Sequence, residues 1–205
     1  MDKQQHWQQV YTTKAADTVS WYQPQASESL QRIQQAQVDV SARIIDVGGG
    51  ASTLVDGLLA AGFTRLTVLD ISAAALAVAR QRLGPAGEQI NWLAGDVTTV
   101  ALPEAGFDVW HDRAVFHFLT EAADRAAYVR QLNHALAPGG LVIIATFAED
   151  GPEKCSGLPV VRYTPAALSA ALGDGFVLTD SQKVAHHTPF DTVQQFVYCS
   201  FRRRR

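Results

Sequence analysis

Four aspartates stand at the ends of predicted β-strands, and they are the first residues whose type and spacing suggest chemistry. They are Asp46, Asp70, Asp96 and Asp112. In an open α/β sheet the ligand crevice lies outside the carboxyl ends of the strands, so we expect these carboxylates to converge on one cleft. Such a cleft suits a ligand with several hydrogen-bond donors and a positive charge, and it repels a bare pyrophosphate.

A glycine-rich turn accompanies the first aspartate. Gly48, Gly49 and Gly50 follow the first predicted strand and open the first predicted helix. Glycine lets the strand turn sharply and lets the backbone approach a ligand closely. Asp70 stands 20 residues beyond Gly50, where an acid accepts both hydroxyls of a ribose. A helix-capping or turn aspartate is the alternative for Asp70, because the next helix begins just after it.

The glycine turn departs from the dinucleotide-binding fingerprint. That fingerprint places glycine or alanine three residues after its second glycine, and Thr53 stands at this position. The sequence also lacks the Tyr-x-x-x-Lys pair of short-chain dehydrogenases. Another nucleoside cofactor is therefore favoured, and a nicotinamide oxidoreductase stays as an alternative.

The elements that must position these residues alternate between strands and helices. Short, nearly continuous apolar runs are typical of strands buried on both faces of a parallel sheet. Apolar residues at helical spacing lie between them, and glycine or proline follows each helix. The expected strands are 43–47, 66–69, 90–93, 107–110 and 141–147, and the expected helices are 52–61, 72–83 and 121–137. This repetition predicts a doubly wound α/β domain.

The pattern changes after residue 147. A loop that contains Gly151, Pro152, Gly157 and Pro159 leads to an expected helix over about 164–172. Two strand-like runs follow, over 176–184 and 195–201. They predict a hairpin-like pair at the end of the domain.

The first 40 residues have a different character. Polar helical segments are interrupted at Pro24, and Trp7, Tyr11, Trp21 and Tyr22 stand among glutamines. Aromatic residues in a segment too polar to form its own core must pack elsewhere. A helix over the sheet edge and a lid that stacks on a ligand are equally good interpretations. We expect a helical cap, residues 1–40, packed on a domain of residues 41–205, as one structural domain overall.

Five successive motifs lie between about residues 42 and 147. They are Asp46-x-Gly48-x-Gly50-x-Ser52, Leu69-Asp70-Ile71-Ser72, Gly95-Asp96-Val97, residues 107–113 and residues 136–140. Together they resemble the motifs of class I S-adenosylmethionine-dependent methyltransferases, and the Pro138-Gly139-Gly140 turn makes the set specific. The resemblance implies a single Rossmann-like domain with a seven-stranded, mostly parallel sheet, an antiparallel last strand and helices on both faces.

The resemblance also implies the cofactor S-adenosyl-L-methionine and roles for individual residues. At the adenosine end, Asp70 would hold the ribose hydroxyls and Asp96 the adenine amino group. Val97 would offer its backbone amide, and Ile71 would pack on the adenine. The implied cofactor-binding residues are Trp7, Tyr11, Asp46, Gly48, Gly49, Gly50, Asp70, Ile71, Asp96, Val97 and Asp112.

At the methionine end, the resemblance places Trp7 and Tyr11 over the cofactor, with Asp46 and Asp112 facing its ammonium or sulfonium. The amino-terminal pair and the Asp112-Arg113 step are similar to the branch that contains elongation-factor lysine methyltransferases. Thiopurine methyltransferases share a similar Asp-Arg step. This branch motif therefore does not decide the substrate.

The catalytic residues stay unassigned, with Asp112, His111 and His186 as candidates. A base is needed only if the acceptor must lose a proton. Strand alternation points His111 away from Asp112, which favours a hydrogen-bonded core histidine. His186 precedes the last strand, where methyltransferase loops often shape the acceptor pocket, and a turn histidine is equally plausible. No metal site is expected, since the histidines lack ligand spacing.

Composition limits the partners. Lys and Arg number 17 against 20 Asp and Glu, so the net charge of -3 disfavours nucleic acid. No apolar run approaches the roughly 20 residues that span a bilayer, and polar residues follow Met1. We therefore expect a cytoplasmic protein that is a monomer or a weak dimer, without a membrane partner.

The acceptor is expected to be a small molecule rather than a protein, because the compact chain has little insertion to build a protein-docking platform. A protein lysine methyltransferase is the first alternative. A non-catalytic adenosylmethionine-binding module and a nicotinamide oxidoreductase are the second.

Overall fold

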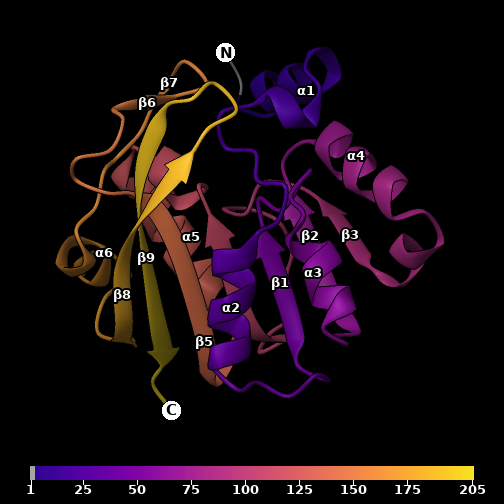
Figure 1. Cartoon of the computed structure of the whole chain (residues 1–205). Helices are drawn as coiled ribbons and strands as arrows, with labels where there is room; N and C mark the ends of the chain where they lie inside the picture. The colour runs from indigo at the N-terminus through magenta and orange to yellow at the C-terminus, as the bar shows by residue number, and fades with distance from the viewer. Residues whose placement is uncertain (1–2) are drawn as a thin grey trace.

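Seven strands form one twisted sheet in the order β3-β2-β1-β4-β5-β9-β8 (Figure 1), in a computed structural model that describes residues 3–205. The strands from β1 to β5 are parallel, and β9 is antiparallel to both of its neighbours, β5 and β8. The bounds are β1 Arg43–Val47, β2 Arg65–Asp70, β3 Asn91–Ala94, β4 Phe107–Arg113, β5 Leu136–Phe147, β8 Phe176–His187 and β9 Val193–Arg203. The predicted mixed sheet with an antiparallel last strand is confirmed.

Helices cover both faces of the sheet and bury an apolar cluster on each. Ile33, Leu58 and Leu76 place α2, α3 and α4 on one face, whereas Tyr128 and Leu168 place α5 and α6 on the other. The bounds are α1 Lys3–Thr13, α2 Ser27–Gln35, α3 Leu54–Ala60, α4 Ala73–Leu83, α5 Ala122–Ala135 and α6 Pro165–Leu172. The three layers are those of a doubly wound α/β fold.

The order of the strands fixes where a ligand crevice forms. Successive strands build outward from β1 to β2 and β3, and the chain then returns to add β4 on the other side of β1. The carboxyl ends of β1 and β4 therefore lie at a topological switch point, where open α/β sheets bind ligands. Asp46, the predicted aspartate of β1, lies near this point.

Side-chain alternation along β4 decides which residues face which layer. Val109 packs in the cluster beneath α2 and α3, whereas Trp110 packs beneath α5. By the same alternation, His111 lies on the α2 side and Asp112 on the α5 side. Two neighbours in sequence thus serve different layers.

The amino-terminal segment is held to the domain through polar contacts. The side chain of Gln8 in α1 accepts hydrogen bonds from Ser72 Oγ and from Ala74 N, each at 3.1 Å, at the start of α4. Arg32 in α2 forms an ion pair with Asp180 of β8 and donates to Gln182 Oε1. Helix α1 consequently lies across the carboxyl ends of the strands, and α2 lies on the sheet face (Figure 1).

A short hairpin was not predicted from the sequence. Strands β6 Lys154–Cys155 and β7 Leu158–Pro159 pair where a loop was expected. Two-residue strands leave no hydrophobic period, and Pro159 opposes a strand prediction. Within residues 3–205, no helix combines the length and the apolar character that crossing a membrane requires.

Candidate active site

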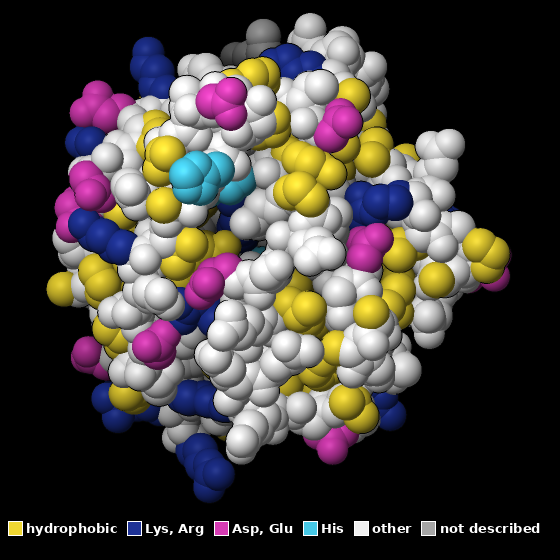
Figure 2. Space-filling view, viewed as in Figure 1, with side chains coloured by type: hydrophobic (Ala, Val, Ile, Leu, Met, Phe, Trp, Pro, Cys, Tyr) yellow, Lys and Arg dark blue, Asp and Glu magenta, His cyan; other side chains and the backbone are white. Residues whose placement is uncertain are grey.

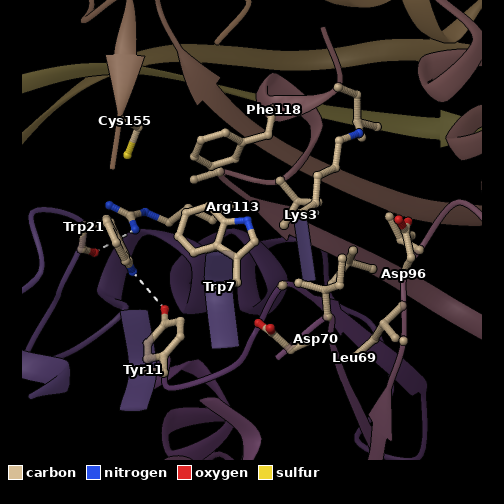
Figure 3. A pocket seen from close by; sticks show the side chains of 18 residues that line it. Lys3, Trp7, Tyr11, Trp21, Leu69, Asp70, Asp96, Arg113, Phe118 and Cys155 are labelled. Carbon is tan, nitrogen blue, oxygen red and sulfur yellow. Dashed lines mark hydrogen bonds between the residues drawn. The ribbon is translucent and has the colours of Figure 1, made fainter. Parts of the chain in front are cut away.

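A cavity of about 120 Å³ lies at the carboxyl ends of the central strands, beneath α1 (Figure 3). We call it the acidic cavity, because Asp70 and Asp96 lie at one end of it. Arg113, Trp21 and Cys155 lie at the other end, with Trp7 between the two groups. Seven of the predicted cofactor residues line it: Trp7, Tyr11, Gly48, Asp70, Ile71, Asp96 and Val97.

Asp70 ends β2 and is almost fully buried at the cavity wall. Its Oδ1 accepts a hydrogen bond of 2.8 Å from the backbone N–H of Ser72. Burial raises the pKa of Asp70 to about 7, and the neighbouring Asp46 adds to this, whereas backbone bonds from Ser72 and Gly50 oppose it. Ser72, and not Asp70, caps helix α4, because its hydroxyl accepts a hydrogen bond from Ala75 N at 3.2 Å.

Asp96 follows β3 and is partly exposed to the cavity. Its Oδ1 accepts from the backbone N–H of Thr98 at 2.8 Å and from the Thr98 hydroxyl at 2.7 Å. These bonds hold the carboxyl group in one orientation. The neighbouring Val97 is buried and lines the same wall.

The glycine turn brings the two acids of β1 and β2 close to the backbone. Gly48 has a φ of 68° and donates to Leu69 O at 2.7 Å, so it crosses from β1 to β2. A Cβ on Gly48 would lie 2.0 Å from Val115 Cγ2, and a Cβ on Gly50 would lie 2.5 Å from Asp70 Oδ2. A side chain at Gly50 would therefore displace the Asp70 carboxyl group.

Aromatic residues of the amino-terminal segment form the roof of the acidic cavity. Trp7 packs edge-on against Trp21 and Phe118, with ring centroids 5.6 Å and 5.0 Å apart. The indole N–H of Trp21 donates to the Tyr11 hydroxyl at 3.0 Å (Figure 3). The predicted aromatic pair Trp7 and Tyr11 thus lies over the cleft.

Comparison with known proteins identifies a methyltransferase domain in the chain. A family model described as a methyltransferase domain matches residues 44–140. An uncharacterised methyltransferase of Mycobacterium tuberculosis is 36% identical over 108 residues, which are 51% of this chain and 50% of the relative. EEF1A lysine methyltransferase 2 of Danio rerio is 29% identical over 133 residues, which are 62% of this chain and 57% of the relative. The chain spans about half the length of the curated relatives it matches.

Solved structures support the same fold. A structure from work on the conversion of a disulfide bond into a thioacetal group during echinomycin biosynthesis has a TM-score of 0.79 and 18% identity, covering 99% of this chain and 94% of that chain. The 1,6-didemethyltoxoflavin-N1-methyltransferase of Burkholderia thailandensis, solved with 1,6-didemethyltoxoflavin and S-adenosylhomocysteine, has a TM-score of 0.69 and 23% identity, covering 96% and 81%.

Residues 44–140 match a methyltransferase domain, and the relatives and the shared fold support the resemblance to class I S-adenosylmethionine-dependent methyltransferases. The methyltransferase match supports S-adenosylmethionine as the cofactor over the nicotinamide alternative. The cavity of the methyltransferase fits such a ligand, since the buried Asp70 and the partly exposed Asp96 can accept hydrogen bonds beside apolar walls from Leu69, Ile71 and Val97. An adenosine carries hydroxyl and amino donors on an apolar base, and the sulfonium adds a positive charge.

A second cavity of the methyltransferase adjoins the first beside the glycine turn. We call it the glycine-loop cavity; Asp46, Gly49, Ser52, Thr53 and His111 are among the residues that line it. Gly50 lines none of the cavities described here. Its backbone N–H bonds to the Asp70 carboxylate instead.

His111 belongs to a buried chain of hydrogen bonds that links the sheet to α2. Its Nδ1 lies 2.7 Å from Asp46 Oδ1, and its Nε2 lies 2.8 Å from Ser29 Oγ. A neutral ring with its proton on Nδ1 donates to Asp46 and accepts from the Ser29 hydroxyl. The expected hydrogen-bonded core histidine is confirmed, and both ring nitrogens are occupied.

Asp112 lies away from the cleft, so the prediction that it faces the cofactor was wrong. It is fully buried on the α5 side, where it accepts from the Tyr128 hydroxyl at 2.6 Å and from Val115 N at 2.9 Å. Burial raises the pKa of Asp112 to about 6, against the effect of these bonds. Its neighbour His111 takes the opposite face, and Asp112 instead fixes the turn after β4.

A third cavity of about 210 Å³ opens on the far side of Arg113. We call it the basic cavity, because Arg113, His186 and His187 line it and no carboxylate of residues 3–205 does. Figure 2 shows histidine side chains at the border of a hollow on this face. The other lining residues are Tyr22, Gln23, Pro24, Gln25, Val184, Ala185, Phe196 and Tyr198.

His186 is the predicted residue that the structure places in the basic cavity. Its Nε2 donates to Ser20 O at 2.8 Å. Burial lowers the pKa of His186, and the nearby Arg113 lowers it further. The imidazole is therefore neutral at pH 7.

Arg113 is the residue that the sequence analysis left out of its site, although the Asp112-Arg113 step was noticed. It lines all of the acidic, glycine-loop and basic cavities. Its Nε donates to the Tyr198 hydroxyl at 3.1 Å and its Nη1 to Trp21 O at 3.0 Å. Because its partners lie on β9 and in the amino-terminal segment, only the fold reveals its position.

Proposed function

We propose that this methyltransferase transfers the methyl group of S-adenosylmethionine to a small molecule bound in the basic cavity. The observation that carries this proposal is the absence of any carboxylate among the described residues that line that cavity. A lysine ammonium entering it would meet the guanidinium of Arg113, and no described carboxylate lines the cavity to bind the ammonium. Like charges in a partly buried site repel strongly.

For the cofactor we propose the roles that the family resemblance implies, with Asp112 removed. Asp70 receives the ribose hydroxyls, Asp96 and Val97 hold the adenine edge, and Ile71 packs on its face. Trp7 and Tyr11 roof the methionine end, where an aromatic face near a sulfonium adds about 0.5–2 kcal/mol. The remaining proposed contacts are Asp46 and the backbone of Gly48, Gly49 and Gly50.

When bound, S-adenosylmethionine supplies an electrophilic methyl group on a sulfur that keeps the electron pair of the broken bond. The chain contributes alignment and the exclusion of water. The aromatic roof of Trp7 and Phe118 covers the reacting end. Arg113 lines both the acidic cavity and the basic cavity, so it stands at their junction.

The residues at the junction offer few groups that could accept a proton from the acceptor. Both nitrogens of His111 are bonded within the protein. Burial raises the pKa of the Cys155 thiol to about 11. His186 stays the one original candidate that lines the basic cavity. We propose that the acceptor atom either carries a free lone pair already or loses its proton to solvent.

Labelled cofactor tests this function. The methyltransferase is incubated with methyl-labelled S-adenosylmethionine and either a panel of small acids, thiols and amines or a protein extract. We expect label in small molecules and none in protein. Transfer to protein lysines alone would favour the lysine methyltransferase alternative. Binding of S-adenosylhomocysteine without any turnover across both arms would favour a non-catalytic binding module.

A further inference from the structure

We propose that the basic cavity is an acceptor site for a carboxylate, and that Arg113 is the residue that binds it. This inference rests on the proposed function, because it names the chemical class of the acceptor. It makes Arg113 a substrate-binding residue that sits where the cofactor and acceptor cavities meet.

One nitrogen of the Arg113 guanidinium has no partner within the described protein. Nε and Nη1 donate to Tyr198 and to Trp21, but Nη2 is buried without a hydrogen-bond partner among residues 3–205. A buried donor without a partner costs free energy, especially on a charged group. An oxyanion that accepts from Nη2 would remove this cost.

The charge of Arg113 also lacks a counter-ion. No ion pair joins it to a carboxylate of the described residues. Its guanidinium carbon lies 4.6 Å from the centre of the Phe196 ring, a contact that supports the cation without neutralising it. Arg32 differs in this respect, because it pairs with both Glu28 and Asp180. Arg113 is therefore prepared for an anion from outside.

The groups around the cavity favour one negative charge on an aromatic body. Burial lowers the pKa of His186, so Arg113 supplies the fixed positive charge of this cavity. Neither lysine nor a second arginine stands among the lining residues. A phosphate, with nearly two charges at pH 7, is usually bound by more cations. Tyr22, Phe196 and Tyr198 give the cavity aromatic walls, which suit a flat organic acid.

The other possible carboxylate is that of the cofactor itself, because Arg113 also lines the acidic and glycine-loop cavities. The basic cavity argues for the acceptor, since it lies beyond Arg113 and none of the described aspartates lines it. The two assignments predict different losses when Arg113 is replaced. Binding measurements on an Arg113 variant therefore distinguish the two assignments.

Calorimetry on the wild-type protein saturated with S-adenosylhomocysteine gives the first test. The probes are benzoate, phenylacetate and indole-3-acetate, each compared with its uncharged amide. We expect at least one acid to bind about tenfold or more tightly than its amide, and added salt to weaken that binding. Equal affinities for acids and amides, or no binding of any acid, would overturn the proposal.

Replacement of Arg113 gives the second test. Arg113→Gln should weaken binding of the same acid by about tenfold or more and should change the affinity for S-adenosylhomocysteine by less than about threefold. Arg130→Gln is the matched control, because Arg130 is exposed on α5 and lines none of the three cavities. Thermal unfolding checks that each variant is folded, and the acid–amide comparison stands without any variant.

The outcomes distinguish failure of the proposed methyltransferase function from failure of the carboxylate site. Failure of the wild-type protein to bind S-adenosylhomocysteine would contradict the proposed function itself. Normal cofactor binding without acid binding would contradict only the carboxylate site. If Arg113→Gln loses affinity for S-adenosylhomocysteine while acid binding persists, the guanidinium belongs to the cofactor and the inference is wrong.

Discussion

The carboxyl group of Asp70 is buried and lines the acidic cavity. Asp70→Ala removes one or two charge-assisted hydrogen bonds to the ribose, each contributing about 1.5–3 kcal/mol, so affinity for S-adenosylhomocysteine should fall about tenfold or more. Calorimetry measures the change, with the exposed Asp174→Ala as control. Unchanged affinity in Asp70→Ala would show that another ligand group occupies this position.

The raised pKa of Asp70 adds a pH dependence to cofactor binding. Its pKa lies at about 7, so the free protein holds this carboxyl group protonated below that pH. Ribose hydroxyls donate best to the ionised form, and affinity should fall by up to about tenfold per pH unit as the pH drops below about 7. Asp70→Asn should abolish the dependence. A wild-type affinity that stays flat between about pH 6 and pH 8 would contradict the coupling.

Ser29 tests the hydrogen-bond chain that joins α2 to β1. Ser29→Ala leaves His111 Nε2 buried without its partner, and the free energy of unfolding should fall by about 1–3 kcal/mol. Urea titration measures the loss. Ser27→Ala, at an exposed position of the same helix, should have little effect. An equal loss in both variants would mean that the hydrogen bond to His111 does not cause it.

Helix α1 is expected to contribute to binding of S-adenosylhomocysteine through Trp7. Its Trp7 lines the acidic cavity, whereas Gln9 is exposed on the same helix. Trp7→Ala should weaken binding of S-adenosylhomocysteine several-fold by opening the roof, and Gln9→Ala should not. Calorimetry compares the two. If Trp7→Ala binds as wild type does, α1 only covers the edge of the sheet.

The strands were predictable because burial leaves a signal in sequence. β1 was expected over 43–47 and runs over Arg43–Val47, since continuous apolar runs mark strands buried on both faces. β4 was expected to end at residue 110 but runs to Arg113. The extra residues are polar, and their backbone pairing with β1 and β5 comes from the neighbouring strands rather than from hydrophobicity.

The candidate site was predictable to the extent that strand ends determine it. Asp70 and Asp96 line the acidic cavity as their positions suggested. Asp112 failed because a strand end does not tell which face its last side chain takes, and one residue changes the layer. The environment of Arg113 depends on Trp21 and Tyr198, which are far away in sequence, so no local pattern could have revealed it.

For the molecule as a whole, the buried acid of the cleft lowers stability at neutral pH. Because the pKa of Asp70 is raised by folding, the folded state holds a proton that the unfolded chain releases above about pH 4. The contribution of this group to stability is therefore lost as the pH rises from about 4 to about 7. Asp70→Asn should raise the melting temperature at pH 8 above that of wild type, although it weakens cofactor binding. A lower melting temperature would contradict this balance.

The place of β9 between β5 and β8 has a consequence for biosynthesis. While the chain emerges from a ribosome, β8 is complete before β9 exists, and until then neither β5 nor β8 has its partner on that side. An open strand edge is a template for association with other chains. Nascent chains halted before β9 has left the ribosome should therefore aggregate or recruit chaperones, and emergence of the eleven residues of β9 should end that vulnerable interval.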